Sequence, residues 1–471
     1  MTFTHSTTNQ FKDYRFVHIY RSFSFILLLG DIFGIFIVLG TIFYLQHEKI
    51  IPTFYPSLYY LCPFIFITLY LADAYKFSSQ IARLRNLLKI AIYFALIILA
   101  IILFFITSNS GDLNLFLNQK ITLLNLSLFT TWAIFSRLII IKWIRLQAKN
   151  SSWLILGTDN NAIEFFQKFI SLNPYGNLAF ITESEQENFN LVKPQSKYLG
   201  CLKDLPSLNQ NNWSGIIVAD DADLSKISYE QLVKIRLQGF QVHRLLDFYE
   251  NLFYKIPSSL LKDSKLAFSK NFSILTDEIS LKIKRIIDII LSIFLLLILS
   301  PLMFLVAIAI KLDSEGSIFY SQSRTGLNGN IFQVHKFRSM YQDAERQGIK
   351  WADERDSRIT TVGHFIRLFR IDELPQIWNV IKGEMSLIGP RPERPEFDTK
   401  LKQVIPYYDL RYSVKPGITG WAQVMYPYGA SVKDAYEKLS YDLYYIKNYS
   451  LWLEIEVFLR TIKVVFLGKG R

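Results

Sequence analysis

The sequence has 471 residues, of which 51% are hydrophobic and only 20% are charged, a composition that excludes a disordered chain and a single small domain. Its 52 basic residues outnumber its 40 acidic residues by 12, which favours anionic partners without choosing among lipid headgroups, phosphorylated substrates and nucleic acid. The two cysteines exclude a disulfide framework.

Four apolar runs lie within the first 150 residues, more than the buried helices of a soluble core would account for. Three of them are long enough to cross about 30 Å of hydrocarbon as helices, and one is shorter and contains two prolines. In chain order they are Phe23–Leu45, the short run Tyr55–Ala72, Leu87–Thr107 and Ile121–Ile141. We therefore predict a cytoplasmic tail over residues 1–22 and a four-helix transmembrane domain over residues 23–147.

The charges around these runs predict their orientation. Basic residues gather in the tail, in the second loop and after the fourth run, whereas the other loops contain only Lys49 and Lys120. The positive-inside rule therefore places both ends of the bundle in the cytoplasm, and the lack of a small-residue cleavage site after the first run argues against a cleavable signal peptide. Asp31 lies inside the first run, where it is either functional or a helix-packing contact.

Residues 148–265 alternate apolar strands with helical stretches, which predicts a small parallel α/β domain. The predicted strands cover residues 153–156, 178–181, 215–219 and 240–243. The first strand is followed by Gly157-Thr-Asp-Asn-Asn-Ala162, similar to a dinucleotide-binding turn, but Asp159 stands where that turn needs glycine and would repel a pyrophosphate. We predict a degenerate Rossmann-like domain whose nucleotide pocket has been lost.

A fifth apolar run, Ile286–Ile310, follows a predicted linker over residues 266–280. Ser300 and Pro301 interrupt it, and proline removes a backbone donor and bends or breaks a helix. Basic residues flank both sides, so we predict a re-entrant helix over residues 284–312 that returns to the cytoplasmic side. A straight span with a tolerated proline is the alternative.

Two predicted strands, Ser317–Ser323 and Ile331–Phe337, surround the turn Leu327–Asn330. Lys336 and Arg338 lie two residues apart, so a strand would place both side chains on one face. Such a pair could clamp a diphosphate, although a solvated edge strand explains it equally well.

A second helix start follows the helical spacing of Ile359–Phe369. Asp372 is a predicted N-cap, Pro375 suits the first turn, and Gly383 is a stop signal. An isolated Asp-Glu-x-Pro would simply cap a helix. Here, however, Asp372 and Glu373 lie among arginines: Arg370 before them, Arg391 in a rigid Gly-Pro-Arg-Pro bend and Arg411 further on.

Two adjacent carboxylates framed by arginines suit phosphoryl transfer through an acyl phosphate, in which one carboxylate is the nucleophile and the other holds Mg²⁺. We expect Asp372 to stay ionised, because a helix dipole and nearby arginines favour the charged form.

Four motifs in this order resemble the bacterial polyprenyl-phosphate sugar-1-phosphate transferases, especially the large members that begin exopolysaccharide or O-antigen repeat units. They are Lys336–Met340, Arg370–Gln376, Gly389–Pro392 and Lys415–Gln423, together with the broken helix at Ser300-Pro301. The resemblance is strong over residues 281–471 and only architectural upstream. It implies an integral membrane α-helical bundle, an α/β dinucleotide-type domain and an α+β catalytic domain with a re-entrant membrane helix.

The resemblance also implies a chemistry. In that family the aspartate of the Asp-Glu pair attacks the β-phosphate of a UDP-sugar and releases UMP, and undecaprenyl phosphate then takes the hexose 1-phosphate. By this likeness Asp372 is the nucleophile and Glu373 helps to bind Mg²⁺. The implied substrate-binding residues are Lys336, Arg338, Arg370 and Arg391, which face phosphates, with Gln376 and Asp442 as further members.

The expected partners are a UDP-sugar, undecaprenyl phosphate and membrane lipids rather than nucleic acid, with a homo-oligomer left open. The expected location is the bacterial inner membrane, with a multi-pass chain and a cytoplasmic catalytic domain.

Two functions from other classes compete with this interpretation. A nucleotide-sugar epimerase or dehydrogenase would use the middle domain, which Asp159 disfavours. A non-catalytic scaffold or transporter of polysaccharide assembly would leave the arginine-framed carboxylates unexplained. A metal hydrolase lacks support, because the six histidines show no ligand spacing. The segment Leu451–Phe466 either lies on the membrane or closes the core.

Overall fold

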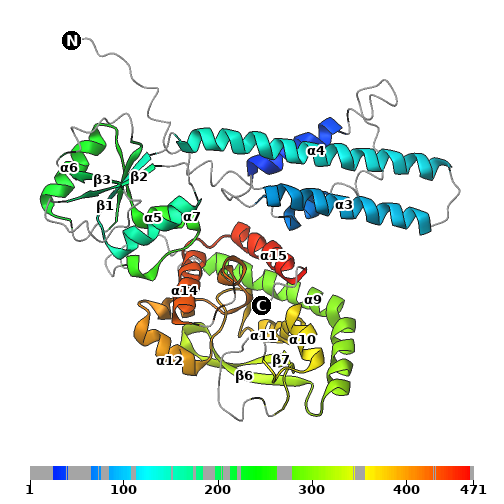
Figure 1. The fold of residues 1–471 in the computed structure, drawn as a ribbon. Helices are drawn as coiled ribbons and strands as arrows, with labels where there is room; N and C mark the ends of the chain where they lie inside the picture. Colours follow the sequence, from blue (N-terminus) through cyan, green and yellow to red (C-terminus); the bar gives the residue numbers. More distant parts are fainter. Residues whose placement is uncertain are drawn as a thin grey trace. The chain divides into compact units, whose positions relative to one another are not determined.

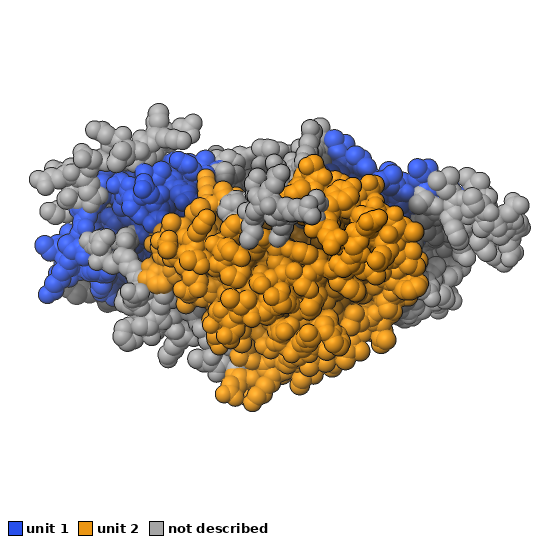
Figure 2. All heavy atoms as spheres, turned by 90° about the horizontal axis from the view of Figure 1, so that it is seen from below, with its two compact units in different colours: residues 1–252 blue, residues 253–471 orange. Residues whose placement is uncertain are grey.

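The computed structural model describes residues 25–38, 40, 65–72, 74–75, 84–107, 113–149, 152–172, 177–183, 197–202, 204, 213–219, 224–261, 278–342, 344, 356–427, 429 and 431–466. The chain divides into two compact units, Met1–Leu252 and Phe253–Arg471, which Figure 2 colours blue and orange. The predicted tail over residues 1–22 and residues 266–277 of the predicted linker lie outside the described residues.

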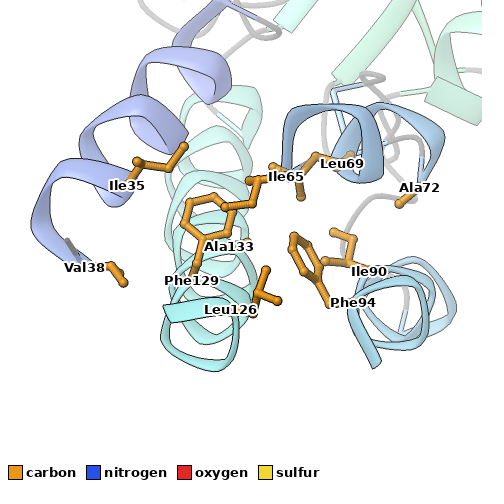
Figure 3. Packing of buried hydrophobic residues seen from close by; sticks show 11 residues of the cluster. Ile35, Val38, Ile65, Leu69, Ala72, Ile90, Phe94, Leu126, Phe129 and Ala133 are labelled. Atoms are coloured by element: carbon orange, nitrogen blue, oxygen red, sulfur yellow. The ribbon is translucent and has the colours of Figure 1, made fainter. Parts of the chain in front are cut away.

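Apolar helices of the first unit share one core. The helices are Phe25–Val38, residues 65–71, α3 (Leu84–Thr107) and α4 (Leu113–Lys149). Figure 3 shows side chains from all four meeting, among them Ile35, Leu69, Phe94 and Phe129. Within the described residues, only Leu123–Ile140 of this unit is long and apolar enough to cross a membrane, while Phe25–Val38 and Leu87–Leu99 are shorter apolar helices.

Asp31 has a partner inside this helical core. Arg137 of α4 pairs with both of its carboxylate oxygens, with Nη2 donating to Oδ2 over 2.7 Å, and both side chains are fully buried. The neighbouring Trp132 donates from Nε1 to the carbonyl oxygen of Gly30 over 3.1 Å. Because a buried carboxylate needs such compensation, the structure favours a helix-packing contact for Asp31.

The predicted parallel α/β domain is confirmed. Its sheet has the strand order β3-β2-β1-β4-β5, with every neighbouring pair parallel, and this is the order of doubly wound dinucleotide-binding folds. The strands are β1 (Ser152–Leu156), β2 (Asn177–Thr182), β3 (Lys197–Cys201), β4 (Gly215–Val218) and β5 (Gln241–Arg244). The helices are α5 (Asn160–Leu172), α6 (Lys226–Leu237) and α7 (Leu245–Phe253). The sequence missed only β3, an edge strand that lacks the continuous apolar run of its neighbours.

Carboxylates occupy the places where this fold would bind a dinucleotide. Asp159 accepts a hydrogen bond from the backbone N of Ala162 over 3.2 Å at the start of α5. Glu183, directly after β2, accepts from the backbone N of Ser225 and from Ser228 Oγ, over 2.8 and 2.6 Å, at the start of α6. Asp159 thus caps α5, and Glu183 is bonded to the cap residue of α6, Ser225. Because both acids are already used within the chain, the arrangement supports the prediction of a lost nucleotide pocket.

The second unit begins before the predicted linker. The indole of Trp421 donates to the carbonyl oxygen of Tyr254 over 2.9 Å, and the backbone N of Ile256 donates to the carbonyl of Ser440 over 2.8 Å. Lys255, nearly buried, pairs with Glu437 over 2.6 Å. Residues 253–261, including the 3₁₀ helix η4 (Ser258–Leu260), therefore form a strap on the second unit, although the sequence had placed them in the middle domain.

Helix α9 (Glu278–Asp313) continues through Pro301, and it is the second helix among the described residues that is long and apolar enough to span a membrane. Figure 1 shows that its ribbon changes direction partway along. Ser300 Oγ, next to the proline, donates to the carbonyl oxygen of Leu297 over 2.9 Å. The predicted break is thus a bend within one helix.

Both halves of α9 are attached to the same unit. In the first half, Asp288 accepts from Ser386 Oγ and from the backbone N of Leu387, over 2.7 and 3.2 Å, both in strand β8 (Ser386–Ile388). In the second half, Val306 and Ile310 pack in a core with Phe337 and Ile366. A straight helix of this length would measure about 54 Å, so the bend is what allows both halves to contact one domain. Between these contacts the helix exposes apolar side chains, including Phe294, Leu297, Phe304 and Leu305.

The predicted hairpin is present. Strands β6 (Phe319–Thr325) and β7 (Ile331–Phe337) pair antiparallel around the turn η6 (Leu327–Gly329), in which Asn328 has a φ of 55°. Because β7 ends at Phe337, Arg338 lies outside the strand, and the prediction that it shares a strand face with Lys336 is wrong. Arg338 instead donates to the carbonyl oxygens of Ser314 and Glu315, each over 2.7 Å, just after the end of α9.

Short helices and a second small sheet complete the unit. In chain order they are α10 (Thr361–Leu368), η7 (Ile371–Gln376), α11 (Ile377–Lys382), β8, α12 (Pro395–Val404), η8 (Tyr408–Ser413), β9 (Gly417–Thr419), α13 (Trp421–Met425), α14 (Val432–Lys447) and α15 (Leu451–Phe466). Strands β8 and β9 are parallel. Helix α15 closes the core through Leu453 and Val457 and leaves an apolar face, including Trp452 and Ile455, exposed.

Candidate active site

Asp372 and Glu373 lie in η7, a 3₁₀ helix that leads directly into α11. Arg370 precedes it with a φ of 55°, a left-handed conformation that is uncommon outside glycine. Asp372 is therefore inside η7, and its predicted role as an N-cap is wrong, because Arg370 holds the cap position. Gly383 ends α11 with a φ of +89°, as its stop signal predicted.

Three cations converge on Glu373. Arg391 donates to it through both terminal nitrogens, over 2.5 Å to Oε1 and 3.3 Å to Oε2. Lys336 Nζ lies 3.2 Å from Oε1, and Arg370 Nη1 lies 3.4 Å from Oε2. The structure thus brings together four predicted site residues from β7, η7 and the loop after β8.

The pKa values in this cluster follow from burial and charge. Burial opposes ionisation of Glu373, but the charges of Arg391, Lys336 and Arg370 outweigh it and hold its pKa well below the usual range. Burial lowers the pKa of Lys336, partly offset by Glu373, and for Arg391 the charge of Glu373 more than compensates burial and raises the pKa. Glu373 is therefore a carboxylate at any working pH, neutralised by the chain's own cations.

Asp372 is the contrasting member of the pair. Its side chain is buried, and no residue in the described part of the chain donates a hydrogen bond to its carboxylate or lies within ion-pair distance. Burial and the adjacent charge of Glu373 raise its pKa to about 6, against the lowering effects of Lys336, Arg367 and Arg391. The nearby cations do lower the pKa of Asp372, as the sequence predicts, but burial and Glu373 outweigh them. With a pKa of about 6, the Asp372 carboxyl group is still mostly ionised at pH 7. An ionised carboxylate left open beside cations is suited to act as a nucleophile.

Two glycines position Arg391. The backbone N of Gly389 donates to the carbonyl of Thr419, and that of Gly417 donates to the carbonyl of Pro390, each over 2.9 Å. A Cβ on Gly389 would lie 2.5 Å from the carbonyl oxygen of Lys415, so no larger residue fits without backbone movement. This close approach of two strands holds the loop that carries Arg391.

Asp442 is linked to the cation cluster indirectly, through Arg411. The buried guanidinium of Arg411 lies 3.1 Å from Asp442 Oδ2, and the same nitrogen, Nη2, donates to the carbonyl oxygen of Arg391 over 2.8 Å. Burial raises the pKa of Asp442 to about 6, although Arg411 pulls it down. Asp442 thus supports the loop that carries Arg391.

Arg338 and Gln376 are not part of the cation cluster as the structure describes it. The terminal nitrogens of Arg338 are directed at carbonyl groups at the end of α9, and Gln376 is buried at the junction of η7 and α11. Their contacts with a substrate stay predictions.

Sequence reasoning missed several charges near the site. Arg367 of α10 acts on the ionisation of Asp372, and Arg324 at the end of β6 pairs with Glu393 over 3.2 Å. Burial lowers the pKa of Arg324, and Arg391 and Glu373 both act on it. Glu393 directly follows the Gly-Pro-Arg-Pro segment, so that motif could have drawn attention to it. Nothing in the sequence, however, indicates that Glu393 pairs with Arg324, which lies 69 residues earlier.

The carboxylates of the site do not form a complete set of Mg²⁺ ligands by themselves. Among the described residues, no three His, Cys, Asp or Glu side chains gather closely enough to hold a metal ion, and both oxygens of Glu373 already accept from cations. Mg²⁺, however, is commonly bound by one or two carboxylates together with substrate phosphates. The two adjacent carboxylates therefore fit a Mg²⁺ ion that arrives bound to a diphosphate, and not one held by the protein alone.

Comparison with known proteins places these residues in a wider group. The bacterial sugar transferase family matches residues 279–468. The UDP-N-acetylgalactosamine-undecaprenyl-phosphate N-acetylgalactosaminephosphotransferase of Aeromonas hydrophila is 40% identical over 57% of this chain and 63% of its own length. The undecaprenyl-phosphate glucose phosphotransferase of Komagataeibacter xylinus is 45% identical over 38% of this chain and 35% of its own length.

A shorter relative is covered more fully. The UDP-glucose:undecaprenyl-phosphate glucose-1-phosphate transferase of Caulobacter vibrioides is 39% identical over 38% of this chain and 68% of its own length. The chain therefore covers less than two thirds of the Aeromonas and Komagataeibacter proteins and just over two thirds of the Caulobacter protein.

Proposed function

This chain belongs to the bacterial sugar transferase family, and we propose from that membership that it moves a hexose 1-phosphate from a UDP-sugar to undecaprenyl phosphate. The observation that carries the proposal is the unequal environment of Asp372 and Glu373. The Glu373 carboxylate pairs with three cations, whereas the Asp372 carboxylate is buried, has no hydrogen-bond or ion-pair partner among the described residues, and has a pKa raised to about 6. The names of the relatives support the acceptor and the sugar-phosphate class.

In the first step the Asp372 carboxylate attacks the β-phosphorus of the UDP-sugar. A bond forms between Asp372 Oδ and phosphorus, the bond from phosphorus to the bridging oxygen breaks, and UMP leaves with that oxygen and its electron pair. Lys336, Arg370 and Arg391 already surround Glu373, and rotation of their flexible ends toward the phosphates would balance the charge that develops.

In the second step a phosphate oxygen of undecaprenyl phosphate attacks the same phosphorus. The acyl phosphate bond breaks, the Asp372 carboxylate is restored, and the product is an undecaprenyl diphosphate sugar. Such a lipid-linked sugar would begin an exopolysaccharide or O-antigen repeat unit.

The remaining site residues have supporting roles in this proposal. Arg411 and Asp442 hold the backbone of Arg391, and Arg338 holds the end of α9 against the domain. Mg²⁺ bound with the diphosphate, with Glu373 as its protein ligand, would supply further neutralisation of phosphate charge.

We also propose a location. The chain would be a multi-pass protein of the bacterial inner membrane, with four spans in the first unit and α9 entering and leaving on the cytoplasmic side. The attachment of both halves of α9 to one unit supports this topology, as does the exposed apolar surface between them. It would place Asp372 on the side where UDP-sugars are made.

The test is to supply UDP-sugars labelled in the β-phosphate, first without any lipid acceptor, and to map the labelled peptide. We expect label on the peptide that contains Asp372 and release of UMP, followed by discharge of the label when undecaprenyl phosphate is added. Asp372→Asn keeps the side chain's shape but removes the nucleophilic oxygen, so labelling should vanish while the protein still folds.

Glu373→Gln should still be labelled, but more slowly, with a weaker response to Mg²⁺. A panel of UDP-glucose, UDP-galactose and their N-acetyl forms would identify the sugar. An epimerised sugar or a reduced nicotinamide cofactor, with no lipid-linked label, would favour an epimerase or dehydrogenase instead. Normal transfer by Asp372→Asn would disprove the covalent mechanism.

A further inference from the structure

Two of the cations around Glu373 come from separate parts of the second unit. Lys336 belongs to the β6–β7 hairpin, and Arg391 belongs to the loop between β8 and α12. Both reach the same carboxylate oxygen, Glu373 Oε1. Two such cations can meet one diphosphate only if the hairpin and the loop keep a fixed position relative to each other.

Glu393, a residue of this loop, joins the loop to the hairpin twice. Arg324 Nη1, near the end of β6, lies 3.2 Å from Glu393 Oε1, and the backbone N of Thr325 donates to the carbonyl oxygen of Glu393 over 3.0 Å. The same Oε1 accepts from the backbone N of Arg394, the residue before α12, over 3.0 Å. Glu393 is thus bound both to the hairpin and to the start of α12.

Arg324 lies on the same face of the hairpin as Lys336. In the antiparallel register Arg324 is opposite Phe332, and Lys336 is opposite Tyr320. Opposite residues share a face and successive residues alternate, so the even-numbered residues of both strands line one face. On this face Gln322 Oε1 accepts from Arg324 Nη2 over 2.8 Å. The guanidinium that contacts Glu393 is therefore held on the face that presents Lys336.

The loop between Arg391 and Glu393 is stiff. These two residues are separated by Pro392, whose ring fixes the backbone φ angle. The carbonyl oxygen of Arg391 accepts from Arg411 Nη2 over 2.8 Å, which holds the loop from a different element. Because the proline leaves little freedom between them, a shift of Glu393 is passed on to Arg391 instead of being absorbed.

The ion pair also compensates a repulsion between cations. Burial lowers the pKa of Arg324, Glu393 opposes this effect, and the charges of Arg391 and Arg394 add to it, while Glu373 favours the charged form. The Arg324 side chain is only 15% exposed, so little solvent screens it from the neighbouring arginines. Glu393 is thus the anion that allows Arg324 to lie close to Arg391.

We propose that Arg324 and Glu393 are positioning residues of the transferase site, and that their ion pair fixes the Arg391 loop against the hairpin that carries Lys336. The proposal rests on the proposed function, in which Lys336 and Arg391 balance the charge of the diphosphate. The pair acts through these two cations, because it keeps them at the spacing that one diphosphate requires.

The experiment measures single-turnover release of UMP from a UDP-sugar by the full chain in nanodiscs. Arg324→Gln, which is too short to reach Glu393, and Glu393→Gln, which removes the charge, should each slow release about tenfold, with label still on Asp372. Since both changes break one interaction, the double variant should be no slower than Arg324→Gln. Arg324→Lys keeps the charge and should recover part of the rate.

A second pair of variants tests whether Arg324 acts through Arg391. Arg391→Gln removes the guanidinium that is to be positioned, so adding Arg324→Gln to it should slow release no further. Hydrogen exchange at the Thr325 amide, which needs no activity, should become faster in Arg324→Gln. Lys282→Gln is the matched control, because it breaks an exposed ion pair of similar length, 3.3 Å to Glu278, and should change neither release nor exchange.

The contrary outcomes are distinct. Additive rate losses in the double variant, or a further loss when Arg324→Gln is added to Arg391→Gln, would overturn the positioning role and favour direct contact of Arg324 with a substrate phosphate. Wild-type rates in both single variants would also overturn it. Each of these results, in a wild-type chain that is labelled on Asp372, leaves the proposed function intact. Absence of that label in the wild type would overturn the proposed function and, with it, the role of the pair.

Discussion

Asp372 and Glu373 are consecutive residues whose carboxyl groups have pKa values shifted in opposite directions. The 3₁₀ turn buries both, but it directs only Glu373 at the cations of Lys336, Arg370 and Arg391. Asp372 is left with the cost of burial and the repulsion of its neighbour, which raise its pKa to about 6. The protein thus keeps one carboxylate neutralised and the other available for chemistry.

The rate of Asp372 labelling should depend on pH with an apparent pKa near 6, because only the ionised carboxylate attacks phosphorus. The rate should be level above pH 7 and fall about tenfold per unit well below pH 6. Single-turnover release of UMP between pH 4.5 and 8 measures this profile, with circular dichroism to confirm that the fold survives. A rate that stays constant down to pH 5 would contradict the assignment.

Asp372→Asn should be more stable than the wild type at neutral pH. A folded-state pKa of about 6 lies above the unfolded value, so stability falls as the pH rises through that range and the charged form carries the penalty. Removing the charge should raise the free energy of unfolding by about 1–3 kcal/mol at pH 7.5, with little difference near pH 4. Thermal midpoints at the two pH values test this, with exposed Asp409→Asn as the control.

Arg411→Lys should slow labelling by about ten- to a hundredfold without abolishing it. Arg411 contacts Asp442 and the carbonyl of Arg391 through Nη2 and the hydroxyl of Tyr408 through Nη1. Lysine keeps the charge but has a single nitrogen on a flexible stem, so it cannot hold all three contacts and Arg391 loses part of its support. Label should still map to Asp372, because Arg411 does not contact the carboxylate pair in the structure. Wild-type rates in this variant would show that the support is unnecessary.

If α9 bends back at Pro301, both of its ends should be accessible from the cytoplasmic side of the membrane. In a background without Cys62 and Cys201, single cysteines at Lys282 and Glu315 should both react with an impermeant thiol reagent from the cytoplasmic side. Pro301→Leu should favour a straight helix and reduce cytoplasmic labelling at position 315. Periplasmic labelling of position 315 in the unaltered helix would contradict the re-entrant path.

A fragment of residues 253–471 should fold and form the labelled Asp372 intermediate. The sequence predicts a catalytic domain that starts after the linker over residues 266–280, but residues 254–256 bind Trp421, Glu437 and Ser440 of that domain. We therefore expect the fragment from Ile279 to keep some activity and to melt at a lower temperature than the fragment from Phe253. Equal midpoints would show that the strap contributes nothing, and an inactive but folded longer fragment would show that the first unit is required.

The sequence by itself determined the long apolar helices, most of the strands and the presence of a site rich in charged residues. Apolar length identified α4 and α9, and the strand rhythm identified four of the five parallel strands, because these signals depend on periodicity within one segment. Neighbouring residues were also enough to predict that Asp159 is incompatible with a dinucleotide-binding turn. They likewise predicted the hairpin around Leu327–Gly329 and the end of α11 at Gly383. The family followed from the order of motifs.

Only the tertiary structure decided which charges meet. Lys336 and Arg338 differ by two positions, yet one contacts Glu373 and the other the end of α9, because β7 ends between them. Asp372 and Glu373 look alike in the sequence, and their different pKa values arise from side chains that converge from β7, η7 and the loop after β8. Ion pairing depends on positions in space that the fold sets over long sequence separations, whereas strands and helices are specified largely by their own residues.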